Sequence, residues 1–229
     1  MDMKKPAHWV IGIDEAGRGP LAGPVAVGVV LVPANFDWRR VPGVGDSKQL
    51  SEAKREEIYQ IANNLHKCGQ LQYAVSMVSA KVIDTVGIVP AVNLALTRAL
   101  ARVIQSTNSP VEPWLQELLP RSNWGRTNEA DWGRVAVKLD GGLKAPAYCV
   151  EQETIIKGDG KEKVIGLASI MAKVTRDRYM RRIASRPAYA AYDFTRHKGY
   201  GTKIHRAAIA KYGLSLEHRA SYCRNIKLR

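Results

Sequence analysis

Hydrophobic positions along the chain follow two patterns, short runs rich in Val and Ile and longer segments with apolar residues three or four positions apart. The short runs predict strands, and the longer segments predict helices. The predicted strands cover residues 9–13, 25–32, 71–77, 135–139 and 148–156. The predicted helices cover residues 51–65, a segment from Pro90 to about residue 103, residues 163–183 and residues 203–212.

The order of these elements predicts how they are arranged. A Gly-Arg-Gly-Pro turn separates the first two strands, which favours an antiparallel pair. Ser51 is placed to cap the first helix, with acidic residues in its first turn. Strands followed by helices and then by further strands and helices indicate an α/β fold, with a mixed five-stranded sheet flanked by helices.

The length of 229 residues suits one large domain, and we expect a single domain over residues 1–229. Residues 106–134 carry three Pro and three Trp, which predicts a loop insertion. Tryptophans in such a loop more often anchor it to the core than bind a ligand. Residues 184–229 are expected to form a basic helical extension at the C-terminal end.

Charge changes this picture, because 35 Lys and Arg face 21 Asp and Glu, a net charge of +14. Residues 173–229 hold 15 of the basic residues and three acids, and so contribute +12. This asymmetry is typical of a nucleic-acid-binding flank, although a solvated face or an acidic membrane surface would also fit it. The three Cys are widely spaced and no signal peptide is expected, which favours a cytoplasmic protein. We also expect no membrane span, because no apolar run reaches 18 residues.

Carboxylates stand at the ends of three predicted strands. Asp14 and Glu15 follow the first, Asp140 ends the fourth, and Asp159 follows the fifth. Asp before Gly is also the commonest turn signal, so Asp140 and Asp159 taken singly are better explained by plain turns, and only together do they favour a cluster. Oxygen ligands without nearby His or Cys favour Mg²⁺ or Mn²⁺, and two such ions would activate a water and stabilise the leaving oxygen of a phosphodiester.

Strand geometry constrains the first pair. Successive side chains of a strand point to opposite faces, so Asp14 and Glu15 cannot both face one site from a regular strand. We therefore expect the first strand to end or bend after residue 13. Asp14 would then be the central ligand, with Glu15 reaching in from the edge.

A series of motifs in order along almost the whole chain resembles ribonuclease HII. The motifs are Asp14-Glu15-Ala16-Gly17-Arg18-Gly19-Pro20, Asp46-Ser47-Lys48-Gln49-Leu50, Asp140-Gly141, Lys157-Gly158-Asp159, Ala168-Ser169-Ile170-Met171-Ala172-Lys173-Val174 with Arg176-Asp177, and His197-Lys198-Gly199-Tyr200-Gly201-Thr202. The resemblance implies a ribonuclease H-like fold. It also implies endonucleolytic cleavage of RNA in RNA/DNA hybrids and 5′ to ribonucleotides embedded in duplex DNA, leaving a 3′-hydroxyl and a 5′-phosphate.

The resemblance also assigns residues. The four metal-binding acids of the family fall on Asp14, Glu15, Asp140 and Asp159. Gly17, Arg18 and Gly19 fall at the ribose 2′-hydroxyl, with Tyr200 against the adjoining sugar. Glycine allows this physically, because a backbone without side chains can touch the 2′-hydroxyl that distinguishes RNA from DNA.

Other polar residues are candidates for contacts with the phosphate backbone. They are Lys48, Ser169, Lys173, Lys198 and Lys203, of which Lys48, Lys198 and Lys203 could equally be solvated. His197, His205 and His218 are interpreted as structural or phosphate-contacting. Asp177 lies four residues from both Lys173 and Arg181, and a surface salt bridge explains it without a metal.

Two other classes of protein remain open. A DNA nuclease or transferase of related architecture would also need acids and a basic flank, but would gain nothing from reading a 2′-hydroxyl. A non-catalytic nucleic-acid-binding module explains the charge but not the acids. Ribonuclease HIII is a near neighbour that typically lacks the arginine between the glycines, whereas Arg18 is present. We expect a monomer and leave protein partners open.

Overall fold

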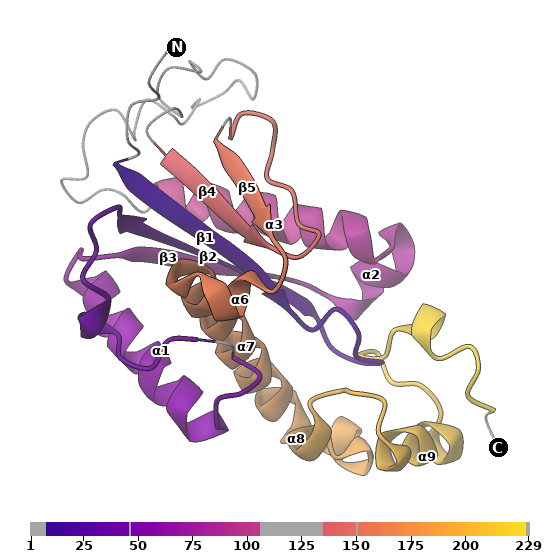
Figure 1. The fold of residues 1–229 in the computed structure, drawn as a ribbon. Coiled ribbons are helices and arrows are strands. Elements are labelled where there is room, and N and C mark those ends of the chain that lie inside the picture. Colours follow the sequence, from indigo (N-terminus) through magenta and orange to yellow (C-terminus); the bar gives the residue numbers. More distant parts are fainter. Residues whose placement is uncertain (1–7, 46, 106–134, 150, 228–229) are drawn as a thin grey trace.

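A computed structural model of the chain describes residues 8–45, 47–105, 135–149 and 151–227, which build a five-stranded sheet in the order β3-β2-β1-β4-β5 (Figure 1). The strands are β1 (Trp9–Ala16), β2 (Val25–Pro33), β3 (Gln72–Val78), β4 (Val135–Asp140) and β5 (Gln152–Ile155). Strands β1, β2 and β3 form an antiparallel meander, while β4 is parallel to β1 and β5 is parallel to β4. The sheet is therefore mixed, as predicted.

Helices cover both faces of this sheet (Figure 1). The helices of the described residues are η1 (Trp38–Arg40), α1 (Glu52–Lys67), α2 (Ala80–Val86), α3 (Ile88–Gln105), α6 (Gly158–Lys161), α7 (Lys163–Ala184), η2 (Pro187–Tyr192), α8 (Phe194–His197), α9 (Lys203–Tyr212) and η3 (Ala220–Tyr222). Helix α3 packs on one face of the sheet, and α7 with α1 packs on the other. Apolar residues at alternate strand positions face the two helical layers, which gives one hydrophobic core on each side.

Helix α7 lies unusually close to the sheet. A Cβ atom built on Gly28 of β2 would stand 2.3 Å from the backbone oxygen of Ala168 in α7. Only glycine permits this approach, because any larger residue would push the helix away. Close contact between α7 and the strands brings Ser169, in the N-terminal half of this helix, against the end of β1, where the predicted acids lie.

A third cluster of buried residues joins the C-terminal segment (residues 185–227) to the rest of the fold. Leu21 from the turn after β1 and Met180 from α7 pack there with Phe194 and Ile209. In Figure 1 this segment lies beyond the far end of α7, beside the turn that follows β1. The turn is therefore enclosed by residues distant in sequence.

Most predicted elements are confirmed, and three need correction. Strand β1 continues to Ala16, because its antiparallel pairing with β2 extends to the Ala16 and Ala26 pair, so it does not end after residue 13. Strand β5 covers only Gln152–Ile155. Helix α2 was not predicted, although Ser79 caps it and Gly87 ends it. The predicted loop insertion over residues 106–134 lies outside the described residues.

Helix α3 is long and apolar enough to cross a membrane by length and composition alone, contrary to the expectation that no segment would be. Its buried residues include Ala95, Leu96 and Leu100, which pack in the core on the α3 side of the sheet. A core helix passes the same test of length and hydropathy, and the packing of α3 is that of a core helix.

Candidate active site

Two of the predicted acids are brought together by the parallel pairing of β1 and β4. Ile13 pairs with Leu139, so Asp14 and Asp140 follow at the same edge of the sheet. Asp14 is only 3% exposed. A buried carboxylate beside another carboxylate is unfavourable without compensation, which distinguishes this strand end from an ordinary turn.

The hydrogen bonds of Asp14 compensate it only in part. Its Oδ1 accepts from the backbone amide of Glu15 at 2.6 Å, and its side chain is hydrogen-bonded to Ser169 of α7. Burial raises the pKa of Asp14 well above its usual value, and the negative charges of Glu15 and Asp140 raise it further. The two hydrogen bonds lower it by less.

Ser169 is placed differently from the prediction that it faces phosphate. Its hydroxyl is buried and lies 2.7 Å from the hydroxyl of Ser47, in addition to its bond with Asp14. Ser169 therefore links the loop before α1 to the buried carboxylate. Asp46, which precedes Ser47 in the predicted motif, lies outside the described residues.

Glu15 and Asp14 lie on opposite faces of β1. Ile11 and Ile13 belong to the core under α3, and alternation places Glu15 on their side, whereas Asp14 faces α7. The Glu15 carboxylate is 3.1 Å from the guanidinium of Arg18 in the following turn. Because β1 remains regular to Ala16, the predicted bend that would bring both side chains to one face is absent.

Asp140 ends β4 and Asp159 lies in α6, and each carboxylate accepts from a backbone amide of α6. Asp140 Oδ1 accepts from the amide of Gly158 at 2.6 Å, and Asp159 Oδ1 accepts from the amide of Gly160 at 3.1 Å. Asp159 is buried, and its other oxygen is 3.5 Å from the exposed ammonium group of Lys48. Lys48 thus approaches the carboxylates from the loop before α1.

The donor set has the right chemistry for a hard divalent cation, although it is not arranged around one. Within the described ranges, no three Asp, Glu, His or Cys side chains already lie close enough to hold a metal ion. The available ligands are carboxylate oxygens, which suit Mg²⁺ or Mn²⁺. A cation beside Asp14 and Asp140 would remove the repulsion that raises the pKa of Asp14.

The turn after β1 begins with the Gly17-Arg18-Gly19 loop, whose two glycines have different surroundings. Gly17 has a φ of +86°, and a Cβ atom there would lie 2.1 Å from the guanidinium of Arg176, so glycine is required. At Gly19 a Cβ atom would meet nothing within 4 Å. One glycine therefore faces the interior and the other faces open space.

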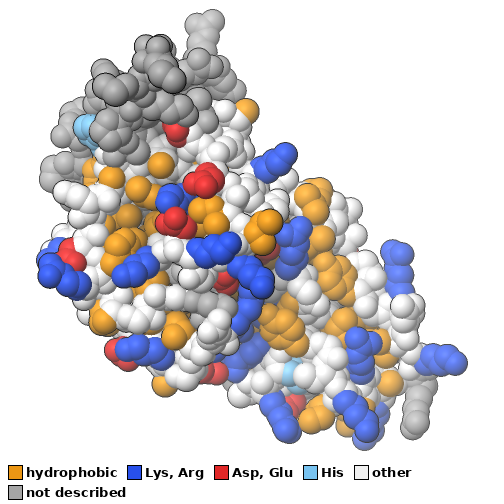
Figure 2. All heavy atoms as spheres, in the orientation of Figure 1, with side chains coloured by type: hydrophobic (Ala, Val, Ile, Leu, Met, Phe, Trp, Pro, Cys, Tyr) orange, Lys and Arg blue, Asp and Glu red, His pale blue; other side chains and the backbone are white. Residues whose placement is uncertain are grey.

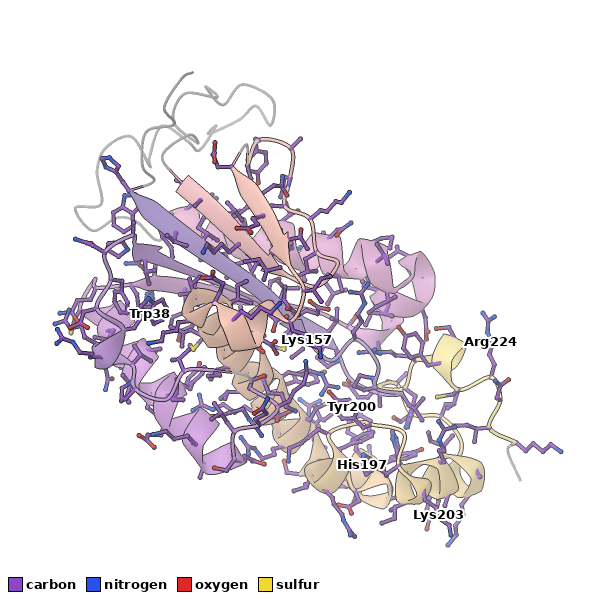
Figure 3. All side chains as sticks on the ribbon, viewed as in Figure 1. Trp38, Lys157, His197, Tyr200, Lys203 and Arg224 are labelled. Carbon is purple, nitrogen blue, oxygen red and sulfur yellow. The ribbon has the colours of Figure 1, made fainter. Side chains whose placement is uncertain are left out.

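Tyr200 lies at the surface between the acid cluster and the C-terminal helices, with Lys157 on one side and His197 on the other in Figure 3. Tyr200 is 41% exposed, and the centre of its ring lies 5.7 Å from Lys173 Nζ and 5.6 Å from the guanidinium of Arg176. An exposed ring held by two cations can offer its other face to a ligand.

Lys173 and Asp177 correct a prediction. Lys173 Nζ is 2.8 Å from Asp177, but Asp177 is buried, so the pair is not a surface salt bridge. Arg181 pairs with Glu52 of α1 instead. The buried pair holds Lys173 beneath the ring of Tyr200.

The remaining predicted lysines, Lys198 and Lys203, differ in their contacts with the rest of the chain. Lys198 donates to the carbonyl of Thr195 and approaches Glu52, whereas Lys203 is exposed at the start of α9. Figure 2 shows basic side chains around the acids and over the C-terminal helices. This face combines positive charge with a small acidic centre.

The three predicted histidines form a buried cluster in the C-terminal segment. His197 and His205 stack at 4.2 Å, and Nε2 of His205 is 3.0 Å from Nε2 of His218. Burial lowers the pKa of His205 and of His218 to about 4. All three are less than a tenth exposed, which favours the structural interpretation over contact with phosphate.

Sequence reasoning missed two arginines. Arg176 and Arg219 are both fully buried and donate to backbone carbonyls of the turn after β1. Arg176 closely follows the helix motif over residues 168–174, but nothing in that sequence indicates burial. Arg219 belongs to no motif and lies in a segment rich in Lys and Arg, where a solvated side chain is the ordinary expectation.

Comparison with known proteins gives one consistent family. The family model described as Ribonuclease HII matches residues 11–112 and 134–225. A curated ribonuclease HII of Endomicrobium trichonymphae is 38% identical over 218 residues, which cover 95% of this chain and 87% of that protein.

Solved structures agree on the fold. The ribonuclease H2 from Pyrococcus horikoshii OT3 has a TM-score of 0.61 and 24% identity, over 96% of this chain and 97% of that chain. Bst-RNase HIII in complex with Mn²⁺ has a TM-score of 0.63 and 17% identity, over 96% of this chain and 69% of that chain. The predicted ribonuclease H-like sheet is thereby confirmed.

Proposed function

Because the chain belongs to the ribonuclease HII family, we propose that it cuts 5′ to ribonucleotides embedded in duplex DNA as well as within RNA/DNA hybrids. The chain is an endonuclease of the ribonuclease H type, which acts on the RNA of such hybrids. The observation that carries the finer proposal is the buried Asp14 beside Asp140, next to a glycine-flanked loop with an open side.

The acids supply the hydrolytic part of this proposal. Asp14 and Asp140 would hold a divalent cation, Mg²⁺ or Mn²⁺, with Asp159 near a second ion. Glu15, on the opposite face of β1, would reach the first ion around the end of the strand. A bound ion would supply Lewis-acid polarisation of the scissile phosphate and of the attacking water. Ser169 keeps the Asp14 carboxylate oriented through their hydrogen bond. Cleavage would leave a 3′-hydroxyl and a 5′-phosphate.

The turn after β1 supplies the recognition of ribose. Gly19 presents backbone without a side chain to open space, so a sugar can approach it closely. Arg18 is exposed beside Glu15, and Tyr200 offers a ring face to the neighbouring sugar. We propose that the Gly17-Arg18-Gly19 backbone contacts the 2′-hydroxyl and that Lys48, Lys198 and Lys203 lie along the phosphate backbone.

Localisation, oligomeric state and domain organisation are proposed on the same basis. A monomer in the cytoplasm, bound to nucleic acid and not to a membrane, fits the net charge of +14 and the core packing of α3. Residues 184–229 would add basic surface for the duplex to the single catalytic domain over residues 1–229.

The test uses three duplexes of one sequence: all DNA, DNA with one ribonucleotide, and RNA/DNA hybrid, each with Mg²⁺ or Mn²⁺. We expect the native protein to nick the second duplex 5′ to the ribonucleotide, to cut the hybrid and to leave the first intact. Asp14→Asn should lower cleavage at least about 1,000-fold, because the central ligand is lost. Asp37→Asn, the same change on an exposed acid, should cleave normally.

Each alternative predicts a different result. Equal cleavage of the all-DNA duplex would favour a DNA nuclease. Binding of all three duplexes without divalent ion and without any cleavage would favour a non-catalytic binding module. Comparable cleavage by Asp14→Asn and the native protein would refute the assigned site.

A further inference from the structure

Arg219, in the C-terminal segment, binds the turn after β1 through several backbone carbonyls. Its Nη2 donates to the oxygen of Gly17 at 2.6 Å, and its Nη1 donates to the oxygen of Arg18 at 2.9 Å. Nε and Nη2 both donate to the oxygen of Gly23, at 3.0 and 2.9 Å. A single planar guanidinium thus spans both ends of the turn.

The bonds to Gly17 and Arg18 fix two peptide planes. In a trans peptide the carbonyl of one residue and the amide of the next point in opposite directions, and the described residues contain no cis peptide bond. Since both carbonyls point at Arg219, the amides of Arg18 and Gly19 point away from it. Neither amide donates to a protein acceptor within the part of the chain that the structure describes.

Arg219 is itself held firmly. Its own amide donates to the oxygen of Leu21 at 2.8 Å, and its guanidinium lies 5.1 Å from the ring of Tyr222. Asp84 of α2 accepts from the next two backbone amides, those of Ala220 at 2.7 Å and Ser221 at 3.0 Å. The guanidinium therefore has little freedom to move with the turn.

Arg176 supports the same turn at different carbonyls. It donates to Pro24 at 2.9 Å and to Ala22 at 3.1 Å, and it leaves the carbonyls of Gly17 and Arg18 to Arg219. Burial lowers the pKa of Arg219 to about 10, and the nearby Arg176 charge contributes, yet Arg219 stays protonated at neutral pH. Two buried cations beside each other are costly, so their carbonyl partners must compensate them.

We propose that Arg219 is a positioning residue for substrate specificity: it turns the amides of Arg18 and Gly19 outward, where they donate to the 2′-oxygen of a ribonucleotide. This inference rests on the proposed function. Arg219 is fully buried and touches no substrate itself. Its proposed role is to orient the loop that distinguishes ribose from deoxyribose.

The experiment measures kcat/KM on a duplex with one ribonucleotide and the Kd for an all-DNA duplex of the same sequence. Arg219→Met should lower kcat/KM at least about tenfold, because the oriented amides are lost. Its Kd for all-DNA duplex should stay within about twofold of the native value. Arg219→Lys keeps the charge but cannot span the carbonyls. Its kcat/KM should lie between that of the native protein and that of Arg219→Met.

A control arginine with a backbone partner is available on α3, where it is exposed and not buried like Arg219. Arg102 of α3 donates to a backbone carbonyl, that of Val75 in β3, at 3.2 Å. Arg102→Met should leave both quantities near native. A general loss of stability would move cleavage and all-DNA binding together, which circular dichroism and thermal unfolding would reveal.

The outcomes separate the two proposals. If the native protein does not prefer the ribonucleotide, the proposed function fails. If it does, and folded Arg219→Met or Arg219→Lys keeps native kcat/KM, the positioning role is overturned. Should both variants fail to fold, the amide resonances of Arg18 and Gly19 in Asp14→Asn provide the test. They should shift more with the ribonucleotide duplex than with DNA, and equal shifts would overturn the proposal.

Discussion

Two clusters of buried polar residues lie along α7, one beside its N-terminal half and one beside its C-terminal half, and they differ in how fully the chain supplies them with hydrogen-bond partners. The acids at the ends of β1 and β4 repel one another, and the pKa of Asp14 is raised by burial and by that repulsion. The histidines and Arg219 in the C-terminal region have hydrogen-bond partners supplied by the chain. Buried polar groups that lack partners within the chain indicate a site that binds a ligand or an ion. Buried polar groups whose partners the chain supplies indicate a structural role.

In the histidine cluster, the chain supplies hydrogen-bond partners for both ring nitrogens of His205 and of His218. His205 Nδ1 lies 2.9 Å from the carbonyl of Tyr200, so it donates there and its Nε2 accepts from His218. His218 Nδ1 accepts from the amide of Ser215 at 2.9 Å, which leaves its Nε2 as the donor. Both rings are therefore neutral, each in one tautomer, and they hold the backbone that carries Tyr200.

The largest effect on stability should come from Gly17→Ala. The positive φ and the contact with Arg176 would cost about 3 kcal/mol or more in the free energy of unfolding. Gly19→Ala, with open space for its Cβ, should change that free energy little but should lower cleavage at a ribonucleotide. Chemical denaturation and cleavage assays measure both. Equal destabilisation by the two substitutions would show that both glycines face the interior.

The next largest effect should come from acid, which lowers the free energy of unfolding through the histidine cluster. The folded pKa of His205 and of His218 is about 4, against about 6.5 unfolded, so the unfolded chain binds more protons between these values. Stability is therefore full above about pH 6.5 and is lost as the pH falls toward 4, by about 2 kcal/mol or more. Urea unfolding across this range should show a shallower loss for His218→Gln. A slope equal to that of the native protein would contradict the linkage.

The smallest effect concerns the acids and has the opposite sign. The folded pKa of Asp14 is raised, so above its unfolded pKa the ionised group destabilises the metal-free protein. In EDTA at pH 7.5, Asp14→Asn should be more stable than the native protein by about 1 kcal/mol, as is common when a functional charge is removed. A clear loss of stability, measured by urea unfolding, would show that Asp14 is structurally satisfied.

The sequence predicted the sheet, its antiparallel pair and α7 because hydrophobic periodicity reports local structure directly. It placed Asp14 and Asp140 at strand ends, and the parallel register then brought them together. It could not predict that β1 continues through Glu15, because that depends on pairing with β2. It also missed Arg219, whose role depends on contacts with Gly17 and Arg18, about 200 residues earlier in the chain.

The most direct test of the difference between the clusters is thermal unfolding measured against Mn²⁺ concentration. An ion that binds only the folded protein raises Tm with its concentration. Native protein and Asp37→Asn should both rise in Tm, and Asp14→Asn should rise much less, because the buried carboxylate that needs a cation is gone. An equal rise in Tm for Asp14→Asn would contradict the account by placing the ion elsewhere.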